Sequence, residues 1–360
     1  MDKKIILALA GSGKTHYISN SFDPKESVYF ISFTHRNVDN IRLAVRERFN
    51  GEIPRNIMIT TFDSFVYNQL IKPIEILLKP LGVKINGVEV NYSPIHDCRD
   101  PRYVKIDKMD HYLTKDRKIY VSRMSKLIVK QSRDIKDILL KRLKKYCNII
   151  YFDEFQDYNG YDFNVIEWIM NEYEGHVVAV GDIYQSLVAP VRRDGGTNSF
   201  KPFSDIRNCD DVKLKTKLKN NIEVVKDTMY GSRRVSENVA RFIRESMGIP
   251  ILGHNGEGSV IEIESMSEID AIMTDPTIKK LVWNKSVVSD KMTDYINWSY
   301  SKGDTYKDSC VILTSNTNNI GSWKSLEINV RNKLYVALTR SKRNVYLVHI
   351  EDFKRWKESK

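Results

Sequence analysis

The residues with the clearest potential for chemistry lie near the N-terminus, in the segment GSGKT at residues 11–15. A short apolar stretch at residues 5–10 precedes this segment, and residues 14–22 have the composition of a helix. In a strand–glycine loop–helix arrangement, backbone N–H groups converge on phosphate oxygens and the helix N-terminus adds positive potential. The segment therefore predicts a phosphate-binding loop.

Each residue type in this loop suits the binding of a nucleotide. The glycines allow close approach of the backbone, Lys14 would reach the β- and γ-phosphates, and the Thr15 hydroxyl would ligate Mg²⁺. The usual pattern has a glycine where this chain has Ala8, and alanine is the smallest substitute for glycine. The residues that we expect to bind the phosphates of ATP are Ala10, Gly11, Ser12, Gly13, Lys14 and Thr15.

Carboxylates follow two further apolar segments of the chain. Asp153 and Glu154 come directly after IIYF, and Asp182 comes after VVAVG, with Gln185 three residues later. A carboxylate at a strand end beside the loop can hold Mg²⁺, and a neighbouring glutamate can orient and deprotonate an attacking water. We therefore expect Asp153 to be a magnesium ligand and Glu154 to act on water. Gln185 is placed to hydrogen-bond the γ-phosphate.

Apolar strands and amphipathic helices alternate along the 360 residues of the chain. This alternation predicts an α/β fold with parallel sheets. A polar segment at residues 191–221 separates two such regions, and we interpret it as a boundary or linker. We expect a first domain over residues 1–222 and a second domain over residues 223–360, both of ordinary size.

The formal net charge is +11 at pH 7. Much of this excess lies at residues 99–145, which hold sixteen Lys or Arg residues and six Asp residues. We interpret residues 66–147 as a basic helical subdomain inserted into the first domain. Such an excess indicates a polyanionic partner, nucleic acid first, although a solvated helical face has the same composition.

Several features indicate the compartment. No apolar run approaches the roughly 18 residues that a membrane span needs, and the apolar stretch near the N-terminus is too short for a secretory signal. The four cysteines are far apart, so they indicate neither a zinc site nor a disulfide framework. We expect a soluble intracellular protein, in the cytoplasm or, for a viral protein, in the cytoplasm or nucleus of the host cell.

Taken in chain order, eight segments resemble the motifs of superfamily 1 helicases of the UvrD/Rep type. They run from residue 8 to about residue 348 and are AGSGKT, FISFTHRNVDNI, ITTFDSF, FDEFQD, VGDIYQS, SRRVSENV, SYSKGDTYKDSCVIL and LYVALTRSK. Between Arg234 and Ser301 there is no room for the large insertion that this family carries in its second domain. The resemblance is therefore to a compact form, of a size often met in viral or phage replication proteins.

The resemblance implies two RecA-like domains with ATP and Mg²⁺ in the cleft between them. Arg234 and Arg340 would come from the second domain and act as arginine fingers on the γ-phosphate. Arg233 stands where the family has a tyrosine that stacks on adenine, and Gly303 matches a further nucleotide-binding position. Single-stranded nucleic acid would cross both domains, and the positions that match this track are Thr34, His35, Thr61, Phe62, Ser301 and Lys302.

Three functions are compatible with these motifs. The first is an ATP-dependent DNA helicase or single-stranded DNA translocase of replication or repair, which DEFQD favours. The second is a viral-type RNA helicase of the same superfamily, to which SKGDTY and ALTRSK are almost equally suited. The third is a replication or recombination accessory protein that binds single strands and uses ATP only as a switch. A phosphate-transferring kinase would leave VGDIYQS and VALTRSK unexplained.

Overall fold

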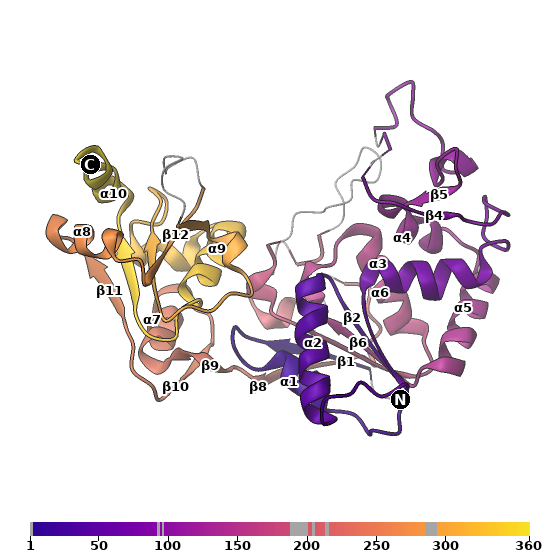
Figure 1. Ribbon diagram of the computed structural model, residues 1–360, viewed down its shortest axis with the longest axis horizontal. Coiled ribbons are helices and arrows are strands. Elements are labelled where there is room, and N and C mark those ends of the chain that lie inside the picture. The colour runs from indigo at the N-terminus through magenta and orange to yellow at the C-terminus, as the bar shows by residue number, and fades with distance from the viewer. Residues whose placement is uncertain are drawn as a thin grey trace.

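Two parallel sheets organise the chain in the computed structural model, which describes residues 3–91, 94–95, 97–187, 201–203, 206–212, 216–284 and 294–360 (Figure 1). The first sheet contains, in spatial order, β3 (Ile57–Thr61), β2 (Val28–Ser32), β6 (Ile149–Asp153), β7 (His176–Gly181), β1 (Lys3–Ala8) and β8 (Glu223–Met229). The second contains β11 (Val260–Ile263), β15 (Val345–Val348), β14 (Asp308–Ile312), β12 (Ile278–Val282) and β13 (Tyr295–Asn297). Because the strand pairings in both sheets are parallel, the predicted fold class is confirmed.

The first sheet has an apolar core on both of its faces. In β1, Ile5 and Leu7 join one buried cluster, whereas Ile6 and Ala8 join another. Successive side chains of a strand point to opposite faces, so this division is the one that a sheet covered on both sides requires. The helices of this half are α1 (Lys14–Asn20), α2 (His35–Arg48), α3 (Phe62–Phe65) and α6 (Gly160–Glu172), with short turns η4 (Phe155–Asp157) and η5 (Ile183–Gln185).

The inserted region between β3 and β6 is more varied than the predicted helical subdomain. It contains η1 (Val66–Ile71), η2 (Lys72–Ile74), β4 (Gly87–Glu89), η3 (Met109–His111), β5 (Lys118–Tyr120), α4 (Val121–Val129) and α5 (Arg133–Tyr146). Its first part is π-helical in η1 and then tightens in η2, where Pro73 has no N–H to donate. The α-helices of this basic subdomain are α4 and α5, and Arg123 and Lys126 of α4 are buried rather than solvated.

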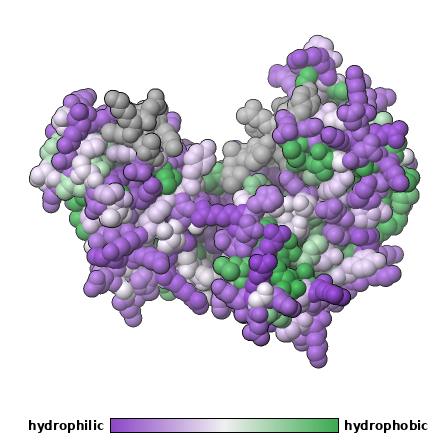
Figure 2. Space-filling view, viewed as in Figure 1, coloured by the Kyte–Doolittle hydropathy of each residue, from purple (hydrophilic) through white to green (hydrophobic). Residues whose placement is uncertain are grey.

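From β8, at the edge of the first sheet, the chain passes through β9 into the second half of the molecule, which contains the second sheet (Figure 1). Its elements outside the second sheet are β9 (Gly231–Ser236), α7 (Glu237–Met247), β10 (Leu252–His254), α8 (Met266–Thr274), η8 (Ser299–Ser301), η9 (Ile320–Ser325), α9 (Ile328–Leu338) and α10 (Ile350–Glu358). The visible face is hollowed between the two halves, and hydrophilic residues cover most of it (Figure 2). Within the described residues, no helix has both the length and the apolar composition needed to cross a bilayer.

The position of strand β8 concerns the expected boundary between the two domains, at residues 222/223. It pairs with β1 at the edge of the first sheet, although it belongs to the second half by that division. Pairing with β8 satisfies N–H and C=O groups that β1 would otherwise expose at a sheet edge. We therefore propose that the division falls after β8. Residues 191–200, 204–205 and 213–215 of the predicted boundary segment lie outside the described residues.

The packing of the first sheet predicts a large difference between two apolar truncations. Ile31→Ala in the fully buried strand β2 should lower the free energy of unfolding by about 2–5 kcal/mol, because it removes contacts and leaves a cavity. Leu43→Ala on α2, where the side chain is 59% exposed, should change it by no more than about 0.5 kcal/mol. Chemical denaturation measures both values, and equal losses would contradict this description of the core.

Candidate active site

The glycine loop between β1 and α1 is held in a conformation that requires glycine. Gly11 and Gly13 have φ angles of 74° and 86°, in the left-handed region that side chains disfavour. A Cβ atom on Gly11 would lie 2.6 Å from Ser232 Oγ and 2.8 Å from Arg234 Cβ. The N–H of Arg233 donates to the Gly11 carbonyl at 2.9 Å. The loop is therefore packed directly against β9.

Two polar groups of the loop are available to an anion. The Ser12 hydroxyl is buried and has no hydrogen-bond partner among the described residues. Lys14 has no ion-pair partner within that same part of the chain, yet its charge lowers the pKa values of Asp153, Glu154, Asp157 and Asp182. Unpaired donors at a positive helix N-terminus are the donor set that phosphate oxygens accept from. The loop therefore fits a phosphate group.

Asp153 and Glu154 end β6 beside the loop, and their environments separate their pKa values. Asp153 is buried and accepts a hydrogen bond from Ser32 Oγ at 3.0 Å. Burial and the charge of Glu154 raise the pKa of Asp153 to about 7. Burial alone would raise the pKa of Glu154 too, but the charges of Lys302 and Lys14 outweigh it and lower this pKa to about 2. Glu154 is therefore the more readily ionised member of the pair.

The backbone of Glu154 is also unusual, because it has a φ of 52° without being glycine. This left-handed conformation costs energy, and such residues gather at functional sites. Within the described residues, no group of three or more His, Cys, Asp or Glu side chains is arranged to hold a metal ion. Of the two predicted magnesium ligands, Asp153 ends β6 and Thr15 lies in the first turn of α1, directly after Lys14.

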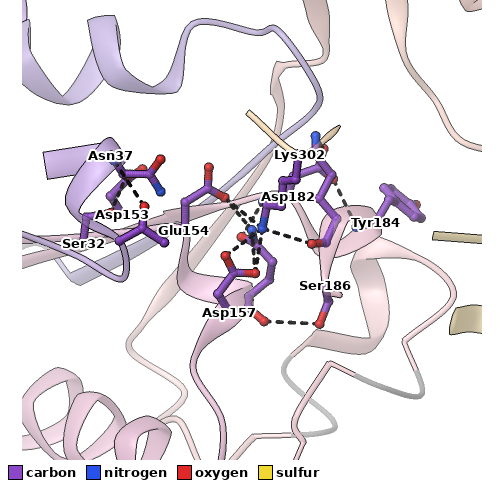
Figure 3. Close-up of polar contacts among 12 residues, drawn as sticks. Ser32, Asn37, Asp153, Glu154, Asp157, Asp182, Tyr184, Ser186 and Lys302 are labelled. Atoms are coloured by element: carbon purple, nitrogen blue, oxygen red, sulfur yellow. Dashed lines mark hydrogen bonds and ion pairs between the residues drawn. The ribbon is translucent and has the colours of Figure 1, made fainter. Parts of the chain in front are cut away.

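Lys302 brings a positive charge from the second half into this acidic cluster (Figure 3). Its ammonium group lies 2.7 and 2.6 Å from the two carboxylate oxygens of Asp157 and 3.7 Å from Glu154 Oε2. It also donates to the Gln185 carbonyl at 3.2 Å. The sequence predicted Lys302 as a nucleic-acid contact, but its charged end faces carboxylates of the first half. Contact of Lys302 with nucleic acid stays a prediction, and in this structure its ammonium group is paired with Asp157 and Glu154.

A chain of hydrogen bonds joins the two acidic strand ends. Gln185 Nε2 donates to Asp182 Oδ2 at 2.8 Å, so the predicted γ-phosphate ligand is turned toward this carboxylate. The Asp182 N–H donates to Gln156 Oε1 at 2.9 Å, and Gln156 Nε2 donates to Glu154. A Cβ at Gly181 would lie 2.3 Å from Gln156 Oε1, so a side chain there would displace the Gln156 amide from this position. Gln156 is not among the predicted site residues, although it is the glutamine of DEFQD.

The two arginines predicted as fingers lie at the same junction. The buried Arg340 guanidinium donates to the Val336 carbonyl at 2.7 Å and to Thr339 Oγ1 at 2.9 Å. Arg234 Nη1 donates to the Thr339 carbonyl at 3.4 Å. Burial and the charge of Arg234 lower the pKa of Arg340 to about 9, and the charge of Arg340 in turn helps to lower the pKa of Glu154. The arginines and the catalytic glutamate candidate are therefore electrostatically coupled.

Tyr335 is a residue of this junction that sequence reasoning missed. Its buried hydroxyl accepts a hydrogen bond from the Ala10 N–H at 3.0 Å and donates to Asp182 Oδ2 at 3.4 Å. The Ala10 N–H, predicted as a phosphate donor, is therefore bonded to α9 of the second half. The sequence feature that could have identified Tyr335 is its place in LYVALTR, five positions before Arg340. Tyr335 therefore ties α9 to the loop, and Arg340 follows two residues after the end of the same helix.

The other residues predicted at the nucleotide lie beside the loop and the junction. Arg233 is exposed, and its guanidinium carbon lies 3.8 Å from the position of a Cβ on Gly13. Gly303 is exposed with a φ of 88°, and its carbonyl accepts from Arg36 Nη2 at 3.4 Å. Arg233 therefore borders the loop, whereas Gly303 lies where the two halves meet.

The residues predicted along a nucleic-acid strand divide into exposed and buried groups. Thr34 and His35 are exposed, and Thr34 Oγ1 caps α2 by accepting from the Asn37 N–H at 3.2 Å. Thr61 caps α3, where it accepts from Ser64, and Phe62 packs in the core against Tyr158. Ser301 is also buried. Thr61, Phe62 and Ser301 are therefore buried in this structure, whereas Thr34 and His35 are exposed, and contact of a strand with these residues stays a prediction.

No protein-family model matches the sequence, and no curated protein matches it. Among solved structures, the chain is similar to the PRRSV helicase, with a TM-score of 0.46 and 12% identity over 97% of this chain and 52% of that chain. It is also similar to arterivirus nonstructural protein 10, a helicase, in complex with DNA, with a TM-score of 0.47 and 11% identity over 96% of this chain and 60% of that one. A crystal structure of the arterivirus protein gives a TM-score of 0.45 and 12% identity, over 96% and 59% of the two chains. The chain therefore spans little more than half the length of these solved chains.

The electrostatics of Asp182 predict how stability varies with pH. Burial raises the pKa of Asp182 to about 6, and the charge of Lys14 and the hydrogen bond from Gln185 offset this only in part. Because the pKa is higher in the folded than in the unfolded chain, this group stabilises the fold fully below about pH 4 and progressively less as pH rises through about 6. Asp182→Asn should therefore flatten the fall in the free energy of unfolding between about pH 4 and 7. Denaturation at a series of pH values tests this, and parallel curves would contradict it.

Proposed function

We propose that the chain is an ATP-dependent DNA helicase or single-stranded DNA translocase that hydrolyses ATP at the junction of its two halves. The observation that carries this proposal is the meeting of cations from both halves at one ionised glutamate. Lys14 belongs to the loop of the first half, and Lys302 and Arg340 belong to the second, and all three lower the pKa of Glu154. A hydrolytic site that forms only between two halves can couple chemistry to their movement.

The loop and the ends of the first sheet would hold the nucleotide. Gly11, Ser12 and Gly13 would bring backbone and hydroxyl donors to the phosphates, and Lys14 would add its charge. Thr15 and Asp153 would hold Mg²⁺, for which Asp153 must be ionised. Bound MgATP supplies the phosphoanhydride bond and a divalent charge on its oxygens.

Glu154 would orient the attacking water and accept its proton. The charges of Lys302 and Lys14 favour its ionised form by lowering its pKa, so it can accept a hydrogen bond from water, and the hydrogen bond from Gln156 holds one of its oxygens in place. Arg340, with a pKa of about 9, keeps its charge at neutral pH and would stabilise the charge that develops on the transferred phosphoryl group. Arg234 would add a second guanidinium group from the second half of the molecule.

Substitution of these groups should abolish hydrolysis that a single strand stimulates. We expect Glu154→Gln to lower kcat by about a hundredfold or more and Arg340→Lys by about a thousandfold. Lys14→Ala should remove detectable turnover, whereas Lys25→Ala, at an exposed lysine of the same half, should behave as wild type. Phosphate release is measured with single-stranded DNA, single-stranded RNA or no strand. Hydrolysis that is unstimulated and independent of Lys14 would refute the proposal.

The form of the strand dependence separates the proposal from its alternatives. Stimulation by RNA rather than DNA would favour a viral-type RNA helicase. Unwinding of duplexes with a 3′ tail, a 5′ tail or no tail distinguishes a helicase from a translocase and gives the direction of movement. A replication or recombination accessory protein that uses ATP as a switch would bind single strands without stepping along them.

The tie between Tyr335 and the loop predicts a kinetic effect. Tyr335→Phe keeps the ring but removes both hydrogen bonds, so α9 should hold Arg340 less firmly against the closed site. We expect kcat to fall about thirtyfold, since two hydrogen bonds of this kind contribute about 1 kcal/mol each, with KM for ATP within about twofold. Tyr346→Phe in β15 is the matched control. An unchanged kcat, or an equal loss in the control, would speak against this role of Tyr335.

A further inference from the structure

One aromatic ring stands out at the junction between the two halves. The Tyr300 side chain is 80% exposed, more than any other large hydrophobic side chain among the described residues. It lies in η8, two residues after Trp298. Trp298 is buried, and its Nε1 donates to the Leu281 carbonyl at 3.1 Å. A well-anchored turn therefore presents a ring that gains nothing from burial within this chain.

The neighbours of Tyr300 point inward and fix the turn. The Ser301 hydroxyl donates to the Trp298 carbonyl at 2.7 Å, and the Asp304 N–H donates to the Ser301 carbonyl at 3.0 Å. Lys302 reaches the carboxylate of Asp157 in the first half. The turn is held from inside by these contacts, and Tyr300 is the member that faces solvent.

The same turn is joined to a basic segment of the first half. Arg36 forms an ion pair with Asp304 at 2.6 Å and donates to the Gly303 carbonyl. Arg36 follows Thr34 and His35, which are the exposed members of the predicted strand-binding set. Tyr300 is therefore carried by a turn that contacts the segment where a polyanionic strand is expected.

Other aromatic residues of the described chain are less suited to hold a strand across both halves. Phe62 and Phe203 are buried, and Phe203 packs against Phe155 with ring centroids 5.1 Å apart. Tyr17 and Tyr146 are exposed, but they belong to α1 and α5 of the first half. Tyr300 is the exposed ring on the turn through which the second half contacts the first.

We propose that Tyr300 is a stacking platform for one unpaired base of a single strand of DNA or RNA, an inference that rests on the proposed function. Every base has a flat π-face, so such a platform binds without regard to sequence. Lys302, two residues later, is paired with Glu154 and Asp157. A base held on Tyr300 would therefore engage the same turn that places a cation beside the catalytic glutamate.

Strand affinity of the full chain tests this site. Kd is measured by fluorescence anisotropy with labelled oligothymidylate and oligouridylate on the order of 12 nucleotides long, which separates DNA from RNA as the source of the base. Tyr300→Ala should raise Kd between about fivefold and a hundredfold, and Tyr300→Phe, which keeps the ring, should stay within about twofold. Leu252→Ala, at a side chain 50% exposed in β10 and outside the basic subdomain, is the control and should bind as wild type.

An abasic strand of the same length isolates stacking from charge. Wild type should bind the abasic strand more weakly than the normal strand, whereas Tyr300→Ala should bind the two strands with similar Kd values. The dependence of Kd on salt should be the same for both proteins. Equal Kd values for wild type and Tyr300→Ala, or equal losses on the abasic strand, would overturn this inference alone. A wild type that binds no strand would overturn the proposed function and this inference together.

Discussion

The ammonium group of Lys302 among the carboxylates of the first half is the interaction on which the rest of the site depends. Asp157 and Glu154 lie at the end of one strand, and Asp182 lies at the end of its neighbour. Buried carboxylates repel one another and are costly to desolvate, so they need cations within a few ångströms. Lys14 provides one charge from within the first half, whereas Lys302 provides the other only when the two halves are together.

This requirement makes the candidate site a property of the closed molecule. Tyr335 joins α9 to the loop through the Ala10 N–H, and Arg340 follows from the end of the same helix. The turn that carries Lys302 also carries Asp304, which pairs with Arg36. Two short segments of the second half thus contact the loop, the acids and the start of α2. Any change in the angle between the halves would alter these contacts together.

Much of the fold was predictable because its strands are locally distinctive. The continuous apolar runs that form β1, β2, β6 and β7 indicate strands covered on both faces, and each is followed by a loop or acid of functional interest. Strand β8 was missed because charged residues, among them Glu223 and Lys226, interrupt its apolar pattern at the edge of the sheet. The predicted helical character of the inserted subdomain is interrupted at η2, where Pro73 has no N–H for regular hydrogen bonding.

The sequence by itself determined which chemical groups are present and which strand ends carry them, because a glycine loop after an apolar strand and an acid at a strand end are local features. Only the tertiary structure decided how these groups pair. Lys302 and Asp157 are 145 positions apart, and Tyr335 and Ala10 are 325 positions apart. Their contacts depend on how the two halves pack, as does the burial of Phe62 and Ser301 and the exposure of Tyr300. Residue type sets what a side chain can do, but the direction of that side chain is settled by contacts with distant parts of the chain.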